Sequence, residues 1–282
     1  MASETASQNS NEMLDWNGRT IPVARSKGGV KAVSHPYDNL IRTGFTAWPP
    51  PEIVQKLYKS RQCRAFEGID LEIATAGLNH YCDLQSLHSE DAITWSVFGT
   101  IARAPQDILE LWLRDLYRLI DLPGAKTDNA EIFLWRRIPH PDTLVSGGPE
   151  IDVGIITSNT VILVEAKWLS GIGAAQGKAK DKDQIQLRGE FLDKYGASIF
   201  PGRPHKVVLG ISLLPNAFKD TMPEGVSFRT TTWQHLSALP SHPLVDELAR
   251  YSEWKTVNSK MTRKGEREAY KRTQIVEPKT KT

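Results

Sequence analysis

The segment between residues 150 and 167 constrains the fold more than any other part of the chain. Two apolar runs, residues 151–156 and 161–166, are separated by the four residues Thr157-Ser-Asn-Thr160. Short apolar runs are typical of buried strands, and the turn-forming residues between them predict a β-hairpin. We therefore expect these two runs to be neighbouring antiparallel strands.

The second strand of this hairpin ends in charged residues. Side chains alternate across a strand, so Val161, Leu163, Glu165 and Lys167 share one face. A charged pair at the end of a buried strand is costly unless partners or a metal ion balance it. Asp152 lies thirteen residues before Glu165, and the short turn should bring the two carboxylates together.

Other periodic segments surround the hairpin. Helical patterns cover residues 52–61, 89–101, 105–120, 178–195, 243–257 and a segment starting near residue 234. Strand patterns cover residues 131–138, 206–213 and 226–231. The segments 161–166 and 206–213 both contain continuous apolar runs and are separated by a helix, which indicates a parallel pair covered on both faces. The predicted class is α/β, with a mixed central sheet flanked by helices on both faces.

The chain divides into three parts on composition. We expect residues 1–44, which are polar and show no sustained period, to be largely disordered, and residues 45–258 to form one domain with helices before its sheet. Residues 259–282 form a basic tail with eight basic and three acidic residues, while the whole chain has a net charge of +2. Such a tail can hold a phosphate backbone, and Lys260, Arg263 and Lys264 are its first candidates. A solvated tail without a partner is the alternative.

Composition also narrows the location and chemistry. No apolar run approaches the roughly 20 residues of a membrane-spanning helix, and the N-terminus lacks a secretory pattern. The two cysteines, Cys63 and Cys82, are not spaced as metal ligands. We expect a cytoplasmic protein without membrane contact, with reduced thiols and no zinc.

The charged residues of the hairpin suit a divalent metal. The carboxylates of Asp152 and Glu165, with the backbone carbonyl of Ala166, make a hard-oxygen site for Mg²⁺ or Mn²⁺. Phosphodiester hydrolysis needs a metal that neutralises the phosphate and lowers the pKa of a bound water. Lys167 would position that water and stabilise the negative charge that develops.

These residues resemble the PD-(D/E)xK superfamily of restriction-endonuclease-like nucleases. Asp152 matches the first acid, and Glu165-Ala-Lys167 matches the ExK element. The resemblance covers residues 89–233 and departs from the motif because Pro149 is not adjacent to Asp152. It implies a restriction-endonuclease-like core and metal-dependent cleavage of nucleic acid that leaves a 5′-phosphate and a 3′-hydroxyl.

Two helices carry further candidates. On a helical wheel Glu90 lies among Ile93, Val97 and Ile101, whereas Asp91 lies near the edge of this apolar arc. Many members of the superfamily place a metal-linked acid on such a helix, so we assign Glu90 to the site; a simple helix-dipole role is the alternative.

Gln184 and Arg188 lie on the apolar face of the helix that follows the hairpin. Related nucleases often carry a glutamine there, so we expect Gln184 to orient the site. Arg188 would contact a phosphate, unless its side chain extends past the core to solvent.

The leading hypothesis is an Mg²⁺-dependent DNA endonuclease, with RNA as an alternative substrate. Its implied partners are DNA, a second copy of the chain and a partner protein in an antiviral defence, restriction or transposition system. The alternative from another class is a catalytically inactive subunit of nuclease fold that binds nucleic acid or assembles with a partner. No GxxxxGK phosphate loop occurs, so we expect no NTPase motor in this chain.

Overall fold

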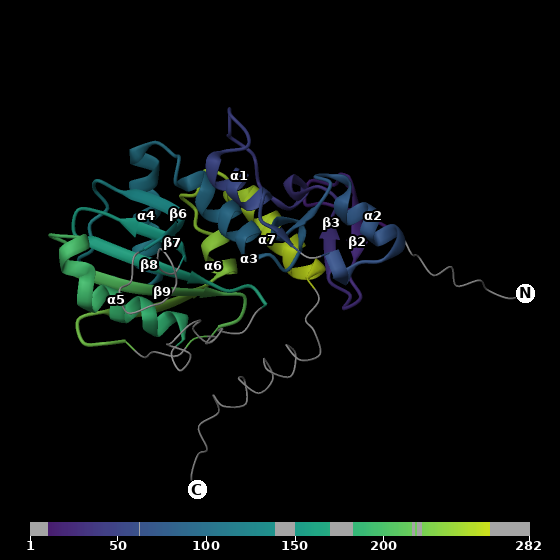
Figure 1. Cartoon of the computed structure of the whole chain (residues 1–282). Coiled ribbons are helices and arrows are strands. Elements are labelled where there is room, and N and C mark those ends of the chain that lie inside the picture. The colour runs from purple at the N-terminus through teal and green to yellow at the C-terminus, as the bar shows by residue number, and fades with distance from the viewer. Residues whose placement is uncertain are drawn as a thin grey trace, which may run out of the picture.

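A five-stranded mixed sheet forms one end of the molecule, on the left in Figure 1. The computed structural model describes residues 11–61, 63–138, 150–169, 183–215, 218 and 222–259. The strand order is β10-β9-β8-β7-β6. The bounds are β6 Glu131–Arg137, β7 Glu150–Ile156, β8 Thr160–Ala166, β9 His205–Ser212 and β10 Ser227–Thr232.

The pairing of these strands confirms the predicted mixed α/β class. Strands β6, β7 and β8 are antiparallel, and β8, β9 and β10 are parallel. The β7–β8 hairpin and the parallel β8–β9 pair both appear where the sequence predicts them. All seven residues of β8 are buried, as a strand covered on both faces requires.

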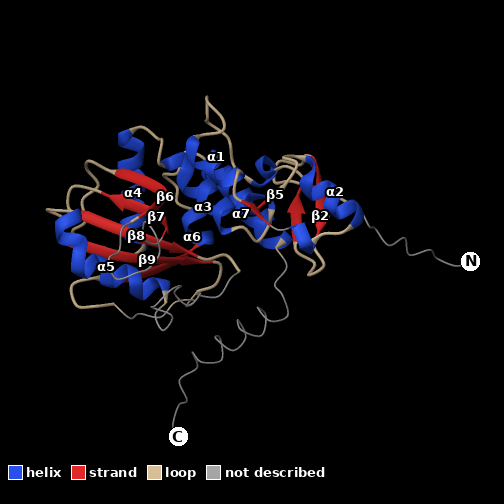
Figure 2. Cartoon of the chain, in the orientation of Figure 1, coloured by secondary structure: helices blue, strands red, loops and turns tan. Residues whose placement is uncertain are grey.

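Helices cover both faces of the sheet (Figure 2). Helix α5 (Gln184–Ile199) packs on the face that carries Val161 and Leu163, through Ile185, Phe191 and Leu192. The opposite face, with Ile162 and Val164, belongs to a larger apolar core that includes Trp112, Leu113 and Leu116 of α4 (Gln106–Leu119). The predicted alternation along β8 is therefore confirmed.

The helix predicted over residues 89–101 is not regular. Helix α3 covers Glu90–Thr94, and a π-helical segment, η4, covers Trp95–Gly99. Ser89 caps α3 by accepting a hydrogen bond from the backbone N–H of Ala92. The widened turn places Gly99 against the Trp95 ring, where a Cβ atom would lie 2.6 Å from a ring carbon.

The N-terminal region corrects the expectation of a largely disordered segment over residues 1–44. Three strands, β1 (Glu12–Leu14), β2 (Thr20–Arg25) and β3 (Lys31–Val33), form an antiparallel sheet. Trp16, between β1 and β2, contacts the rings of Tyr251 and Trp254. These contacts with the C-terminal end of the domain order the segment, and no window of local sequence reveals them. Residues 1–10 lie outside the described residues.

Short elements connect this region to the sheet. They are η1 (Pro36–Asn39), α1 (Pro51–Leu57), β4 (Ser60–Arg61), η2 (Cys63–Ala65), α2 (Gly68–Ala76), β5 (Tyr81–Cys82) and η3 (Asp83–Gln85). Strand β4 pairs with β5, so the chain between α1 and α3 folds back on itself. Strands β2 and β3 and helix α2 lie at the opposite end of the molecule from the five-stranded sheet (Figure 1).

Two helices complete the described fold. They are α6 (Trp233–Ser237) and α7 (Val245–Asn258). Helix α7 buries Leu248 and Tyr251 in the larger core. In the described part of the chain, no helix has the length and apolar character needed to cross a membrane.

Candidate active site

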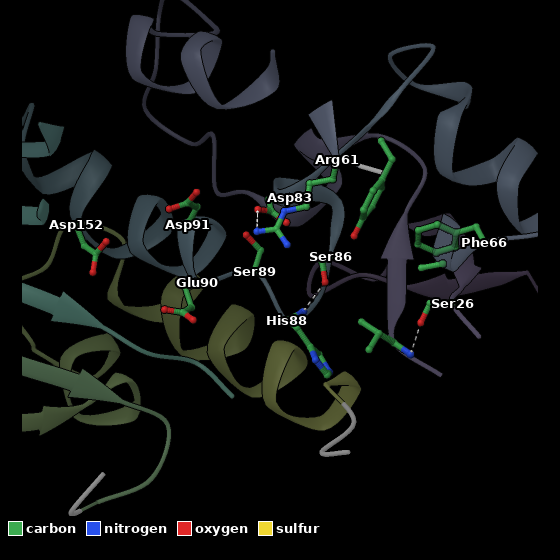
Figure 3. Close-up of a pocket in the computed structure, with 13 residues that line it drawn as sticks. Ser26, Arg61, Phe66, Asp83, Ser86, His88, Ser89, Glu90, Asp91 and Asp152 are labelled. Atoms are coloured by element: carbon green, nitrogen blue, oxygen red, sulfur yellow. Dashed lines mark hydrogen bonds and ion pairs between the residues drawn. The ribbon is translucent and has the colours of Figure 1, made fainter. Parts of the chain in front are cut away.

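Asp152 and Glu165 come together at the end of the β7–β8 hairpin. The last backbone pair of the ladder joins Val153 to Val164, so one step further Asp152 lies opposite Glu165, and opposite side chains share a face. The Asp152 Oδ2 atom accepts a hydrogen bond of 2.8 Å from the Ala166 N–H. The Asp152 carboxylate lines a cleft that Glu90 also lines (Figure 3).

Electrostatics distinguish Asp152 from an ordinary surface acid. Burial, followed by repulsion from the Glu165 carboxylate, raises the pKa of Asp152 from 3.8 to about 8. Arg188 and Lys167 oppose this shift but do not cancel it. The surrounding protein therefore does not offset the cost of ionising both carboxyl groups, and at neutral pH the Asp152 carboxyl keeps its proton.

The Glu165 side chain is buried, and both of its oxygens face cations. Lys167 Nζ lies 2.6 Å from Oε1, and the Arg188 guanidinium pairs with Oε2. Helix α5 packs on the face of β8 that carries Glu165, so Arg188 of α5 contacts this carboxylate from the same face of the sheet. An unpaired carboxylate at such a position would be very costly.

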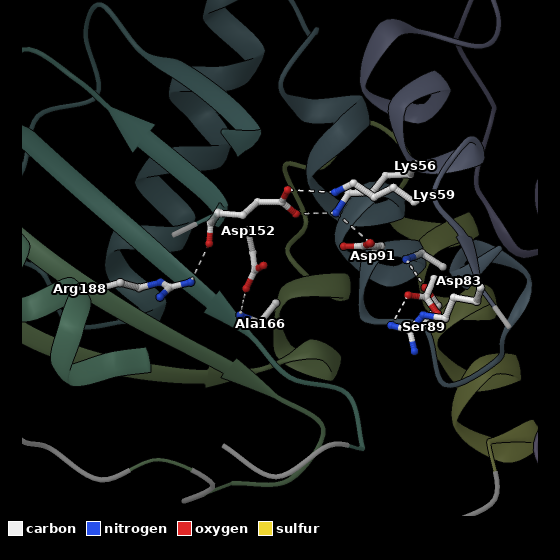
Figure 4. A network of polar contacts seen from close by, with 11 residues as sticks. Lys56, Lys59, Asp83, Ser89, Asp91, Asp152, Ala166 and Arg188 are labelled. Carbon is white, nitrogen blue, oxygen red and sulfur yellow. Dashed lines mark hydrogen bonds and ion pairs between the residues drawn. The ribbon is translucent and has the colours of Figure 1, made fainter. Parts of the chain in front are cut away.

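Arg188 is itself buried, with 3% of its surface exposed. Its guanidinium also donates to the backbone carbonyls of Glu150 at 3.1 Å and Gln184 at 3.2 Å (Figure 4). The prediction that Arg188 faces inward is confirmed, and its side chain does not extend to solvent. Its contacts are with protein acceptors, so in this arrangement it balances the charge of Glu165.

Gln184 is the first residue of α5 and is partly buried. Its backbone carbonyl accepts from Arg188. The structure therefore connects Gln184 to the carboxylate pair through its main chain, and an orienting role for its side chain stays a prediction.

The helical acids of α3 have different neighbours. Glu90 Oε2 lies 3.4 Å from Lys167 Nζ, whereas Asp91 Oδ2 lies 2.9 Å from Lys56 Nζ. Glu90, the acid that the helical wheel indicated, is therefore the one that contacts Lys167 of the predicted site. The short length of α3 does not alter this result, because both residues lie in its first turn.

Lys167 is a permanent cation in this environment. Burial alone would lower its pKa, but the carboxylates of Glu165, Glu90 and Asp152 together raise it above its usual value. A lysine with a raised pKa cannot take up a proton from water at neutral pH. Its chemical contribution is therefore positive charge and hydrogen-bond donation.

Sequence reasoning missed a second layer beneath the site. The buried Lys56 Nζ lies 2.7 Å from Glu150 Oε1 and 4.5 Å from the centroid of the Trp135 ring. Trp135 is a residue of β6 and lies between the pairs Leu134–Val153 and Arg136–Ile151, at the level of Asp152 on β7. It has a positive φ of 54°, which is unusual for a bulky residue. Lys56 is distant in sequence from the hairpin, so no spacing pattern could have connected it to Glu150.

The donors for a metal are few. Among the residues that the structure describes, no group of three or more His, Cys, Asp or Glu side chains is arranged to hold a metal ion. The carboxylates of Asp152 and Glu165 are the close acidic pair, and Glu90 is linked to them through Lys167. Lys260, Arg263 and Lys264 of the predicted basic tail lie outside the described residues.

Comparisons with known proteins do not add to this description. A scan against models of protein families finds no match, and no curated protein or solved structure matches the chain significantly. The function must therefore be argued from the site alone.

Proposed function

We propose that the chain is a metal-dependent endonuclease of PD-(D/E)xK type, with a restriction-endonuclease-like core, that hydrolyses phosphodiester bonds in DNA. The observation that carries the proposal is the meeting of Asp152, Glu165 and Lys167 at one end of a mixed sheet, with Glu90 beside Lys167. These are an acid, an acid and a lysine in the order that the superfamily motif requires.

The donor chemistry of the carboxylate pair fits Mg²⁺ or Mn²⁺. The pKa of Asp152 is raised by burial and then by repulsion from Glu165, and a divalent cation would relieve that repulsion. Asp152, Glu165 and the Ala166 carbonyl would hold the ion. Each Glu165 oxygen has two lone pairs, so it can accept from a cationic side chain and still bind metal. When bound, the ion would supply Lewis acidity and a water of lowered pKa.

The protein groups around the pair each have a role that follows from their contacts. The Ala166 N–H fixes the orientation of the Asp152 carboxylate. Arg188 balances Glu165 from the α5 side, which keeps this carboxylate in place at the strand end. Lys167 would donate to a phosphate oxygen and stabilise the charge that develops there, and Glu90 would orient its ammonium.

Incubation of closed circular plasmid with the purified protein tests this function. We expect nicking or linearisation with Mg²⁺ or Mn²⁺ and none in EDTA, with 5′-phosphate and 3′-hydroxyl ends on the products. Intact plasmid in every metal condition would contradict the proposal and favour a subunit without catalytic activity.

A further inference from the structure

Helix α1 places a buried lysine between two elements that carry acids of the proposed site. Lys56 has 6% of its surface exposed. Its Nζ atom lies 2.9 Å from Asp91 Oδ2 (Figure 4) and 2.7 Å from Glu150 Oε1. Asp91 follows Glu90 on α3, and Glu150 lies two residues before Asp152 on β7. One ammonium group therefore forms a bridge between the helix of one site acid and the strand of another.

The same ammonium group contacts an aromatic ring of β6. Lys56 Nζ lies 4.5 Å from the centroid of the Trp135 ring, a distance at which a cation and a ring attract each other. The Trp135 ring stacks on the Trp95 ring, with centroids 6.3 Å apart. Trp95 is the first residue of η4, which follows α3 directly. Lys56 is therefore connected to both ends of α3, at one end by an ion pair and at the other through stacked rings.

Helix α3 depends on its neighbours for its position. It has five residues, and so short a helix is not stable by itself in water. Apolar contacts of its buried residues Ala92 and Ile93 hold it in the core, but an ion pair with hydrogen bonds also fixes direction. Glu90 Oε2 lies 3.4 Å from Lys167 Nζ, so a small displacement of α3 would separate these two groups.

Burial of the Lys56 ammonium has a desolvation cost. A hydrophobic residue of similar length would fill the same space without this cost. Burial alone would lower the pKa of Lys56, but the carboxylates of Asp91 and Glu150 raise it above its usual value, so the side chain stays charged. The charge provides what an apolar side chain cannot, which is a directed contact with two carboxylates at once.

We propose that Lys56 is a positioning residue that holds α3 against β7 and so sets where Glu90 meets Lys167. Its side chain contacts Asp91, Glu150 and the Trp135 ring, so it acts through the position of α3 and not on the substrate. The consequence for cleavage rests on the proposed function, whereas the position of α3 can be measured without it.

Lys59 offers a matched control close by in the sequence. Its Nζ atom lies 3.1 Å from Glu150 Oε2, and its side chain is 57% exposed. Among the described residues its ammonium group pairs with Glu150 alone. Lys56→Met and Lys59→Met therefore both remove a cation from Glu150, but only Lys56→Met breaks the bridge to α3.

Hydrogen exchange of backbone amides reports on α3 without metal or DNA. Exchange in α3 and η4 should be at least about tenfold faster in Lys56→Met than in wild type, with α5 unchanged and Lys59→Met like wild type. If Lys56→Met does not fold, Glu150→Ala decides, because it breaks the same bridge at a partly exposed carboxylate. Unchanged exchange in α3, or equally faster exchange throughout the chain, overturns the proposal.

Cleavage kinetics separate positioning from contact with DNA. Lys56→Met should lower kcat by about tenfold and leave KM for DNA within a few-fold, because a buried residue that does not touch DNA affects the chemical step. In a Glu90→Gln background the same substitution should have little further effect, since both act through Glu90. Asp91→Asn keeps an oxygen that accepts from Lys56, so it should not reproduce the loss. A raised KM with unchanged kcat, or two losses that multiply, overturns the positioning role.

The two measurements also separate this inference from the proposed function. Faster exchange in α3 of Lys56→Met, with plasmid intact in every metal condition, contradicts the nuclease and leaves Lys56 as the residue that holds α3. Plasmid cleavage by wild type, with unchanged α3 exchange in both Lys56→Met and Glu150→Ala, supports the nuclease and overturns the inference.

Discussion

At the scale of single residues, Glu165 connects stability to chemistry. Its side chain has no exposed surface and faces two cations, so replacing Glu165 should change the free energy of unfolding as well as the chemistry of the site. Glu165→Ala should lower the free energy of unfolding by about 3–5 kcal/mol, because Arg188 becomes a buried cation without its carboxylate. Urea denaturation measures this loss. Glu131→Ala, which breaks an exposed pair with Arg136, is the control and should have little effect. A small loss for Glu165→Ala would mean that water reaches the pair.

The two acids of α3 should separate catalysis from stability. Glu90→Gln weakens the contact with Lys167, so we expect cleavage to slow by about tenfold or more with an unchanged melting temperature. Asp91→Asn weakens the contact with the buried Lys56, so we expect lower stability and cleavage within a few-fold of wild type. Cleavage rates and thermal melts of both variants, compared with wild type, measure these effects. The reverse pattern would place Asp91 in the site instead of Glu90.

At the scale of elements, α7 carries a buried lysine that makes stability depend on pH. Burial lowers the pKa of Lys255 from 10.5 to about 7. Below pH 7 the folded and unfolded chains are both protonated, and the fold bears the full cost of the buried charge. Between pH 7 and 10.5 only the unfolded chain keeps the proton, so stability rises with pH; above 10.5 the difference is complete.

Replacing this lysine should remove that pH dependence. Lys255→Met should be more stable than wild type below pH 7, by an amount on the order of a few kcal/mol, and this advantage should shrink as pH rises to 10.5. Chemical denaturation across this pH range measures the difference, with the exposed Lys126→Met as control. A difference that does not vary with pH would show that Lys255 keeps its proton in the fold.

The elements also show why part of the fold could be predicted from the sequence. Strands β6 to β9 contain apolar runs, so the local sequence pattern was enough to predict them, and the short turn before Thr160 predicted the hairpin. Strands β1 to β3 have three to six residues each, and Trp16 packs on residues more than 230 positions away. The pairing of Arg188 with Glu165 depends in the same way on how α5 crosses the sheet, which no spacing encodes.

At the scale of the whole molecule, the N-terminal region and the sheet meet at the cleft. Helix α7 joins the N-terminal region through two hydrogen bonds, in which Trp254 Nε1 donates to the Leu14 carbonyl and the Tyr251 hydroxyl donates to the Asn39 carbonyl. The same helix shares the larger apolar core with the sheet. The N-terminal sheet also lines the cleft beside Asp152 and Glu90, through Ser26 and Val30 at its β2–β3 turn. The acids and the lysine at its other end could be predicted from the sequence, because they lie on one short hairpin and one helix.

The most direct test of a metal-dependent nuclease in which Lys167 stabilises developing charge is the single-turnover rate of cleavage at saturating protein. The comparison is between wild type and Lys167→Met, which keeps the length of the side chain, with Lys59→Met as a control for lost positive charge. Wild type should cut DNA only with Mg²⁺ or Mn²⁺, and Lys59→Met should stay within a few-fold of the wild-type rate. Lys167→Met should be slower by about 10²–10³ with its fold intact. Cleavage in EDTA, or a Lys167→Met rate close to that of wild type, would contradict this mechanism.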